Sequence, residues 1–208
     1  MQYKWLQKNI SQDLIIFFNG WGMNEKAIQH LDKENQITKN FDCLHFYDYQ
    51  NITMPTIDFS TYQHIYLIAW SMGIYMSNVL TLPYTKKIAF CGTGNPISIK
   101  EGIPPKIYQL TINNFNEQTQ AIFNKKIGFS LNSQQTNTAL KNELIAIQEY
   151  QFTKKTFFDI AFLAKNDFIF PFENQKNYWE YNANKSIILE TKHYPFHLFT
   201  SWKEILMQ

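Results

Sequence analysis

Short runs of continuous apolar residues recur along the chain, and each run ends at a polar or glycine-containing turn. Continuous rather than alternating hydrophobicity is typical of strands that are covered on both faces, as in a parallel sheet. Segments with the apolar spacing of a helix separate several of these runs. The pattern therefore predicts an α/β protein with a mostly parallel sheet and helices on both faces. Strands are expected at residues 13–18, 41–47, 64–69, 87–91, 157–164 and 186–190, and helices at about 24–31 and 72–80.

The strand pattern stops between about residues 113 and 155, where two amphipathic helical patterns take its place. These patterns cover residues 115–126 and 138–150. An interruption of this kind between two strands of an α/β sheet predicts an insertion over the edge of the sheet. No linker, internal repeat or low-complexity segment divides the 208 residues. We therefore expect a single domain over residues 1–208, with a small helical cap at about 113–155.

Composition and charge narrow the class of protein. Every basic residue is a lysine and the net charge is only +2, so no guanidinium group is present for bidentate phosphate binding and we expect no nucleic-acid partner. Neither a signal-peptide core nor an apolar stretch of membrane-spanning length is found, so we expect no membrane association. Cys43 and Cys91 fall within predicted strands and make no metal-binding pattern. We expect a monomeric, cytoplasmic protein with reduced, buried thiols.

The segment around Ser71 is the strongest candidate for chemistry. An apolar strand runs into Ala69-Trp70-Ser71-Met72-Gly73 and then directly into a helical pattern. This is the context of the G-x-S-x-G nucleophile elbow, with alanine in place of the first glycine. Small residues two positions before and after the serine allow a sharp turn that lifts the hydroxyl above the strand ends. We predict that Ser71 is a nucleophile that forms an acyl-enzyme; the alternative is a serine that caps a helix.

Glycines follow several of the predicted strands, at the edge where open α/β sheets bind ligands. They are Gly20, Gly22, Gly73, Gly92 and Gly94. Acyl transfer needs backbone N–H groups aimed at the developing oxyanion. We predict that Trp21, between two glycines, and Met72, after the nucleophile, supply them, although the first segment also suits an ordinary glycine-rich turn. We expect Trp21, Met72 and Trp70 to contact the substrate.

Asp167 is the candidate for the triad acid. It stands where the strand at 157–164 gives way to a turn, so its carboxylate is expected to orient an imidazole at the same edge. The alternative role is that of a turn aspartate which binds its own backbone. Asp159 is a weaker candidate because it opens the strand, and Asp48 precedes Ser71 in the chain.

His193 is the candidate for the general base, since a loop after the last strand allows it to reach back to Ser71. His197, one helical turn later, is the alternative. The order Ser71, Asp167, His193 is the chain order of the α/β-hydrolases, and we predict that fold. The acyl-enzyme mechanism needs neither a metal nor an organic cofactor. The other histidines are expected to be structural: His30, His45 and His64.

The sequence also resembles the BioG family. The resemblance covers nearly the whole chain and rests on four segments: Asn19-Gly20-Trp21-Gly22-Met23, Ala69-Trp70-Ser71-Met72-Gly73, Cys91-Gly92-Thr93-Gly94-Asn95-Pro96-Ile97 and His193-Tyr194-Pro195-Phe196. It implies a serine esterase that removes the methyl group from pimeloyl-acyl carrier protein methyl ester in biotin synthesis.

The resemblance also implies an acyl carrier protein as partner. Because carrier proteins are acidic, lysine pairs such as residues 125–126 are expected to steer this partner electrostatically. Two alternatives stay open. A different small carboxylesterase or a thioesterase would use the same triad, and an inactive hydrolase fold would serve as a binding module.

Overall fold

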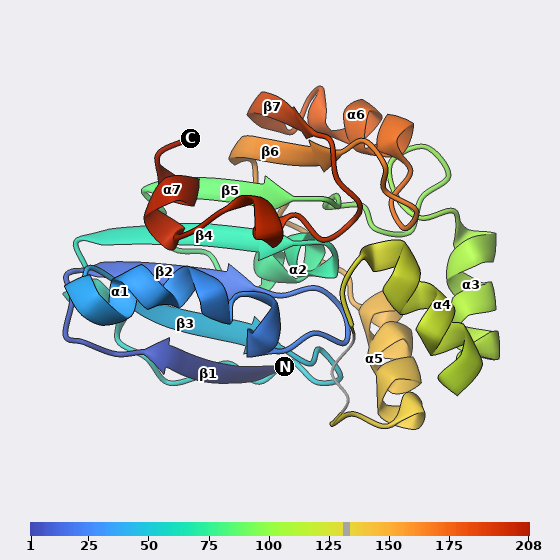
Figure 1. Ribbon diagram of the computed structural model, residues 1–208, viewed down its shortest axis with the longest axis horizontal. Coiled ribbons are helices and arrows are strands. Elements are labelled where there is room, and N and C mark those ends of the chain that lie inside the picture. Colours follow the sequence, from blue (N-terminus) through green and yellow to red (C-terminus); the bar gives the residue numbers. More distant parts are fainter. Residues whose placement is uncertain (131–133) are drawn as a thin grey trace.

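The computed structural model describes residues 1–130 and 134–208 (Figure 1). Within these residues the strands form one seven-stranded sheet of order β1-β3-β2-β4-β5-β6-β7. Only the pairing of β1 with β3 is antiparallel, whereas the others are parallel. This arrangement confirms the predicted α/β class. The strands are β1 (Gln2–Gln7), β2 (Asp13–Phe18), β3 (Asp42–Tyr47), β4 (His64–Trp70), β5 (Lys86–Phe90), β6 (Phe158–Ala164) and β7 (Ala183–Leu189).

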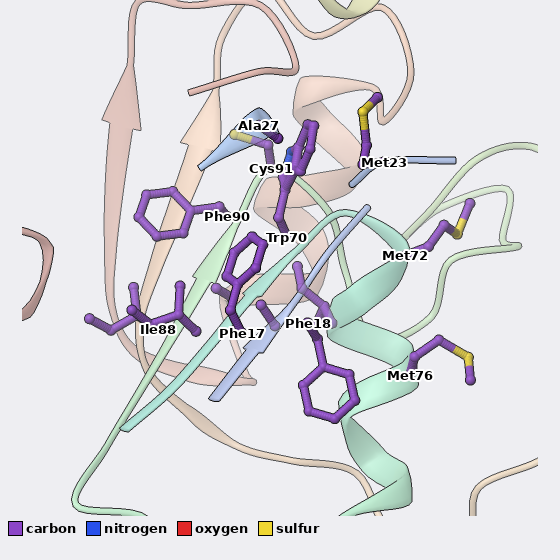
Figure 2. Packing of buried hydrophobic residues seen from close by; sticks show 14 of the residues in the cluster. Phe17, Phe18, Met23, Ala27, Trp70, Met72, Met76, Ile88, Phe90 and Cys91 are labelled. Atoms are coloured by element: carbon purple, nitrogen blue, oxygen red, sulfur yellow. The ribbon is translucent and has the colours of Figure 1, made fainter. Parts of the chain in front are cut away.

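The central strands are continuously apolar because helices cover both of their faces. Phe17 and Phe18 of β2 point to opposite sides of the sheet, and both are fully buried (Figure 2). On one side Phe17 packs against Trp202 of α7, and on the other Phe18 stacks on Phe46. β1 was not predicted because Gln2, Lys4 and Gln7 interrupt its apolar pattern, and none of its residues is buried, as suits a strand at the edge of the sheet.

Helices surround the sheet on its faces and at one of its ends (Figure 1). Helices α1 and α7 share one face, joined by a hydrogen bond from the Trp202 indole to Asp32. None of the helices in the described ranges is long and apolar enough to cross a membrane. The α-helices are α1 (Asp32–Thr38), α2 (Met72–Met76), α3 (Pro105–Asn114), α4 (Glu117–Ile127), α5 (Asn137–Glu149), α6 (Phe172–Trp179) and α7 (Trp202–Leu206).

The helix expected at residues 24–31 is not α-helical. Two short 3₁₀ helices, Glu25–Ala27 and Gln29–Leu31, occupy the segment, and the α-helix begins only at Asp32. Ile28 separates the two because its backbone, at φ −130°, is not helical. Similarly, α2 ends at Met76 and continues as the 3₁₀ helix Ser77–Val79, within the helix predicted at 72–80.

Helices α3, α4 and α5 lie together beyond the carboxyl ends of the parallel strands (Figure 1). In sequence they separate β5 from β6, which nevertheless pair directly. Helices α4 and α5 agree with the two predicted in this region. Helix α3 was not predicted, and it begins before the expected insertion at 113–155. Pro105 occupies the first turn of α3, where proline does not break a helix. Residues 131–133 of that insertion lie outside the described residues.

Helix α2 approaches the end of β2 so closely that only glycine fits at the contact. A Cβ atom at Gly73 would lie 2.2 Å from the carbonyl oxygen of Phe18 and 2.5 Å from that of Asn19. Both obstacles are backbone atoms, so they cannot move away as a flexible side chain would. This contact sets the distance between α2 and the segment that follows β2.

We predict that Gly73→Ala destabilises the fold by about 1–3 kcal/mol or more, the usual cost of overpacking a filled interior. The measurement is urea unfolding of the purified protein. Gly20→Ala is the matched control, because a Cβ there would first meet a Trp70 ring carbon at 3.2 Å. Equal losses in the two variants would contradict the importance of the α2 contact.

Candidate active site

Ser71 occupies a sharp turn between β4 and α2. Its backbone has φ 59° and ψ −124°, a conformation that costs a residue with a side chain about 1–3 kcal/mol. The Ser71 N–H donates to the carbonyl oxygen of Phe90 at 2.9 Å, and the Ser71 carbonyl accepts the Ile74 N–H at 3.1 Å. These bonds hold the strained turn at the carboxyl ends of the parallel strands, where the loops that follow the strands begin.

Three side chains predicted from the sequence meet at this edge in a hydrogen-bonded row. His193 Nε2 lies 2.8 Å from Ser71 Oγ, and His193 Nδ1 lies 2.7 Å from Asp167 Oδ2. The three residues follow β4, β6 and β7, and all three are buried. A row of this kind allows an imidazole to take a proton from the hydroxyl while the carboxylate stabilises the resulting positive charge.

The Asp167 carboxylate is held by several donors besides His193. Its Oδ1 accepts the backbone N–H groups of Ile169 at 2.7 Å and Phe170 at 3.0 Å. Its Oδ2 accepts the side-chain amide of Gln175 at 3.1 Å. Gln175 is fully buried in α6, donates also to the Phe170 carbonyl and accepts the Ala164 N–H. Sequence analysis missed Gln175, because a single glutamine in a helix carries no local signal of such a role.

The loop that carries His193 is supported by two aromatic residues. The indole of Trp70 donates to the His193 carbonyl oxygen at 2.9 Å, and the Phe170 ring lies parallel to the imidazole. Trp70 was predicted as a substrate contact; it lines the cavity beside Ser71, and it also fixes the position of the histidine.

The alternative acids and bases lie away from this row. The Asp159 carboxylate accepts the Lys87 N–H at 2.7 Å and thereby ties the start of β6 to β5. His197 is exposed and stacks on Tyr194. His45 is buried in β3, where burial lowers its pKa to about 3 and keeps it neutral. Among the described residues, no three histidine, cysteine or acidic side chains gather as metal ligands.

The two predicted oxyanion donors flank Ser71. Met72 is the first residue of α2, and the first N–H groups of a helix have no carbonyl partner within it. Trp21 lies in a turn closed by the Met23 N–H, which donates to the Gly20 carbonyl at 3.3 Å. The Trp21 indole donates to the Leu140 carbonyl of α5 at 2.9 Å, so the turn is attached to that helix.

An apolar cavity of about 80 Å³ opens at Ser71 and His193. The turn at Trp21, the Ser71 elbow and helices α3, α4 and α5 all contribute to its wall. The lining residues are Gly20, Trp21, Met23, Trp70, Ser71, Met72, Ile103, Ile107, Tyr108, Thr111, Phe123, Lys126, Ile127, Leu144, Phe168, Ile169 and His193. The Ser71 hydroxyl therefore faces a mostly apolar space.

Residues 1–205 match the protein-family model described as pimeloyl-ACP methyl esterase BioG. Over 201 residues the chain is 34% identical to malonyl-[acyl-carrier protein] O-methyltransferase of Bacteroides fragilis (strain 638R). This match covers 89% of the chain but only 40% of that longer protein. The crystal structure of BioG from Haemophilus influenzae is 29% identical, with a TM-score of 0.85 over 98% of this chain and 99% of that one.

More distant solved structures share the architecture. A lipase-esterase related protein from Clostridium acetobutylicum ATCC 824 superposes with a TM-score of 0.60 at 17% identity, over 93% of this chain and 92% of that one. At this identity the likeness concerns the fold alone. Together with the parallel sheet and the elbow, it identifies the α/β-hydrolase fold that the sequence predicts.

We predict that Gln175→Leu destabilises the fold by about 1–3 kcal/mol, because it leaves the Ala164 N–H and the Phe170 carbonyl without their partner in the interior. Thermal unfolding checks this. Asn174→Leu is the matched control, since the neighbouring Asn174 also donates two hydrogen bonds but lies partly in solvent, where water replaces them. A loss no greater than that of the control would refute the prediction.

Proposed function

The chain belongs to the pimeloyl-ACP methyl esterase BioG family, and we propose that it hydrolyses the methyl ester of pimeloyl-[acyl-carrier protein] in biotin biosynthesis. The observation that carries this proposal is the buried row of Ser71, His193 and Asp167, of which Ser71 and His193 line an apolar cavity. Family membership and esterase-like neighbours support a carboxylic ester hydrolase, and the row supplies the groups for that reaction.

The first half of the reaction forms an acyl-enzyme. His193 Nε2 takes the proton of Ser71 Oγ, and the oxygen attacks the ester carbonyl carbon. The backbone N–H groups of Trp21 and Met72 stabilise the negative charge on the carbonyl oxygen. When the tetrahedral intermediate collapses, the C–OCH₃ bond breaks and the leaving oxygen takes the proton from His193, so that methanol departs.

The second half returns the enzyme to its starting state. A water molecule gives a proton to His193 and attacks the acyl carbon, and the bond to Ser71 Oγ then breaks as this oxygen regains the proton. Asp167 keeps the imidazole in the tautomer that accepts at Nε2, because its carboxylate takes the Nδ1–H. The products are the free carboxylate and the unchanged serine.

The cavity continues outward in a second groove of about 250 Å³ between α3 and α4. Four residues line both spaces and so join them: Ile107, Thr111, Phe123 and Lys126. An acyl chain with its methyl ester at Ser71 has its carrier at the opposite end. We assign the α3–α4 groove to the arm that links the chain to the carrier protein, because this groove runs on directly from the cavity at Ser71.

Lysines near this exit suit an acidic partner. Lys126 lines both the cavity and the groove. The Lys192 ammonium group donates to the Lys125 carbonyl oxygen at 3.2 Å, so three positive side chains lie in the same region. They would raise the rate of encounter with an acidic carrier protein, an effect that salt weakens.

We expect the enzyme to act in the cytoplasm as a monomer. The thiols of Cys43 and Cys91 are both free and buried. Unpaired thiols are usual in a reducing compartment.

We predict that Ser71→Ala lowers the hydrolysis of a short p-nitrophenyl ester by at least about 10³-fold, since the covalent route is lost. Asp167→Asn is expected to cost about 10³–10⁴-fold, because an amide cannot stabilise the imidazolium. Turnover of both variants is measured beside reaction with a fluorophosphonate probe, which should label the wild-type enzyme and spare Ser71→Ala.

The matched control is Asp159→Asn, which changes the other aspartate of the β6 region and should keep near-normal turnover. Loss of activity in this control with retention in Asp167→Asn would reverse the assignment of the acid. A wild-type protein that is folded but inert to the probe would favour a binding module over an enzyme.

We predict that Lys126→Glu raises KM for methyl pimeloyl-[acyl-carrier protein] by up to about fivefold and changes turnover of the short p-nitrophenyl ester much less, since one exposed charge contributes about 0.2–1 kcal/mol. The difference from wild type should shrink in high salt. Lys185→Glu is the control, because Lys185 lies on the edge strand β7, where it pairs with Ile160 of β6, and it lines neither the cavity nor the groove.

Substrate identity is tested separately. Release of methanol from the carrier-bound ester and restored growth without biotin in a strain that lacks its methyl esterase are the expected results. Faster cleavage of an acyl thioester than of the methyl ester would indicate a thioesterase instead.

A further inference from the structure

The turn that carries Trp21 has a backbone that needs support. The Met23 N–H closes the turn on the Gly20 carbonyl, and Gly22, its third residue, has φ 66°. A positive φ at this position is typical of a type II turn, which differs from a type I turn by the orientation of the central peptide. The groups that bind the central Trp21–Gly22 peptide therefore decide which form the turn takes.

A buried carboxyl group of α5 faces this peptide. Glu143 is 0% exposed, and it lies one helical turn after Leu140, which accepts the Trp21 indole. The Gly22 N–H interacts with the Glu143 carboxyl group, and its Oε1 accepts the Tyr49 N–H at 3.1 Å. Helix α5 thus contacts both the side chain of Trp21 and the peptide that follows it.

The other side of the turn is held by Asn19. Its side-chain oxygen accepts the Gly20 N–H at 2.9 Å, and its amide nitrogen donates to the Asn24 carbonyl at 3.0 Å. The Tyr49 hydroxyl donates to the Asn19 carbonyl at 2.7 Å, and the Tyr49 N–H binds Glu143. Tyr49 therefore connects Asn19 to Glu143, and the turn lies between the end of β2 and α5.

A carboxyl group at this position is costly for stability alone. The other buried residues on this face of α5 are apolar: Leu140, Leu144 and Ile147. Glu143 Oε2 is buried without a hydrogen-bond partner, and burial raises the pKa of the carboxyl group to about 8. An apolar residue of the same size would avoid this cost but would leave the buried Tyr49 N–H without its acceptor. Hydrogen bonding rather than apolar packing therefore accounts for Glu143, which fits a role in the geometry of the turn.

We propose that Glu143 is a positioning residue, which binds the turn Gly20–Met23 to α5 and so keeps the Trp21 backbone N–H aimed at the oxyanion. The inference rests on the proposed function, in which Ser71 is the nucleophile. Glu143 acts through the turn, since it does not line the cavity. A displacement of about 1 Å in such a donor is enough to cost about a hundredfold in rate.

Burial keeps the Glu143 carboxyl group uncharged at pH 7, although the backbone N–H groups of Tyr49 and Gly22 favour its charged form. The charged groups that face it are the Asp48 carboxylate, which raises its pKa, and the Met1 amino group, which lowers it. The hydroxyls of Tyr49, Tyr108 and Tyr150 also face it, and each keeps its proton to a higher pH than usual. Ionisation of Glu143 above pH 8 places a negative charge beside the turn that must stabilise an oxyanion, so kcat should fall there.

The test compares two variants of the full chain on a short p-nitrophenyl ester. Glu143→Gln keeps an acceptor and no charge, so kcat at pH 7 should stay within about twofold of wild type and the decline above pH 8 should disappear. Glu143→Leu removes the acceptor, so kcat should fall at least tenfold with KM changed less than twofold. A Leu variant with normal kcat, or a Gln variant that keeps the alkaline decline, would overturn the proposal.

Stability supplies a second measurement that needs no catalysis. The ordinary pKa of a glutamate is 4.5 and that of folded Glu143 is about 8, so between these values the folded state keeps a proton that the unfolded state has lost. Stability therefore falls as pH rises through this window. The Tm advantage of Glu143→Gln over wild type should grow from pH 5 to pH 8, and an advantage independent of pH would count against the buried, uncharged carboxyl group. This measurement holds even where Glu143→Leu fails to fold.

Asp32→Asn is the matched control. Asp32 is a second buried carboxyl group, whose pKa burial raises to about 6, but it binds Trp202 on the face of α1 and α7. The control should keep the wild-type pH profile of kcat. If Ser71→Ala retains activity, the proposed function is wrong. If Ser71→Ala is inactive and Glu143→Leu is fully active, the proposed function stands and only the role of Glu143 is refuted.

Discussion

The backbone conformation of Ser71 is the constraint on which the rest of the site depends. At φ 59° the chain leaves β4 and enters α2 within one residue, and this turn directs the hydroxyl toward His193. The strain costs about 1–3 kcal/mol, and packing on both sides of the turn offsets it. The Phe90 carbonyl binds the Ser71 N–H, and the missing side chain of Gly73 allows α2 to rest against the end of β2. The same contact places the start of α2, with its free N–H groups, beside the turn that carries Trp21.

Sequence patterns predict the parts of this molecule that are specified locally. Buried parallel strands are continuously apolar, so β2 through β7 were predicted from the chain alone. Ser71, Asp167 and His193, whose side chains the structure brings together, were singled out because each follows such a strand. β1 and α3 were not predicted, because an edge strand without an apolar run and a helix that begins at proline carry weak local signals. The roles of Gln175 and Glu143 were not predicted for a different reason. Their roles come from contacts with residues distant in sequence, such as the one between Glu143 and Tyr49, which no spacing rule encodes.

The two tryptophans of the site each serve two purposes. Trp21 and Trp70, both predicted as substrate contacts, line the cavity. Each indole N–H also binds the backbone of another active-site segment, Leu140 in α5 and His193 in the last loop. A buried tryptophan needs a partner for its N–H, and here that need connects the loops to each other. Phenylalanine has no N–H group, so it would leave these segments unconnected.

The position of α3, α4 and α5 between β5 and β6 has a consequence for how the family diverges. The proposed substrate pocket and the proposed catalytic residues lie in different stretches of sequence, because these helices form much of the cavity wall and the row of Ser71, His193 and Asp167 lies on loops outside them. Such a division usually lets an enzyme acquire new substrates by replacing one module. In this chain the replacement of helices α3, α4 and α5 as one module is restricted, since Leu140 and Glu143 of α5 also hold the turn at Trp21. A transplanted module would have to bring an equivalent of that support, so change within these helices should proceed by single substitutions on the face toward the cavity.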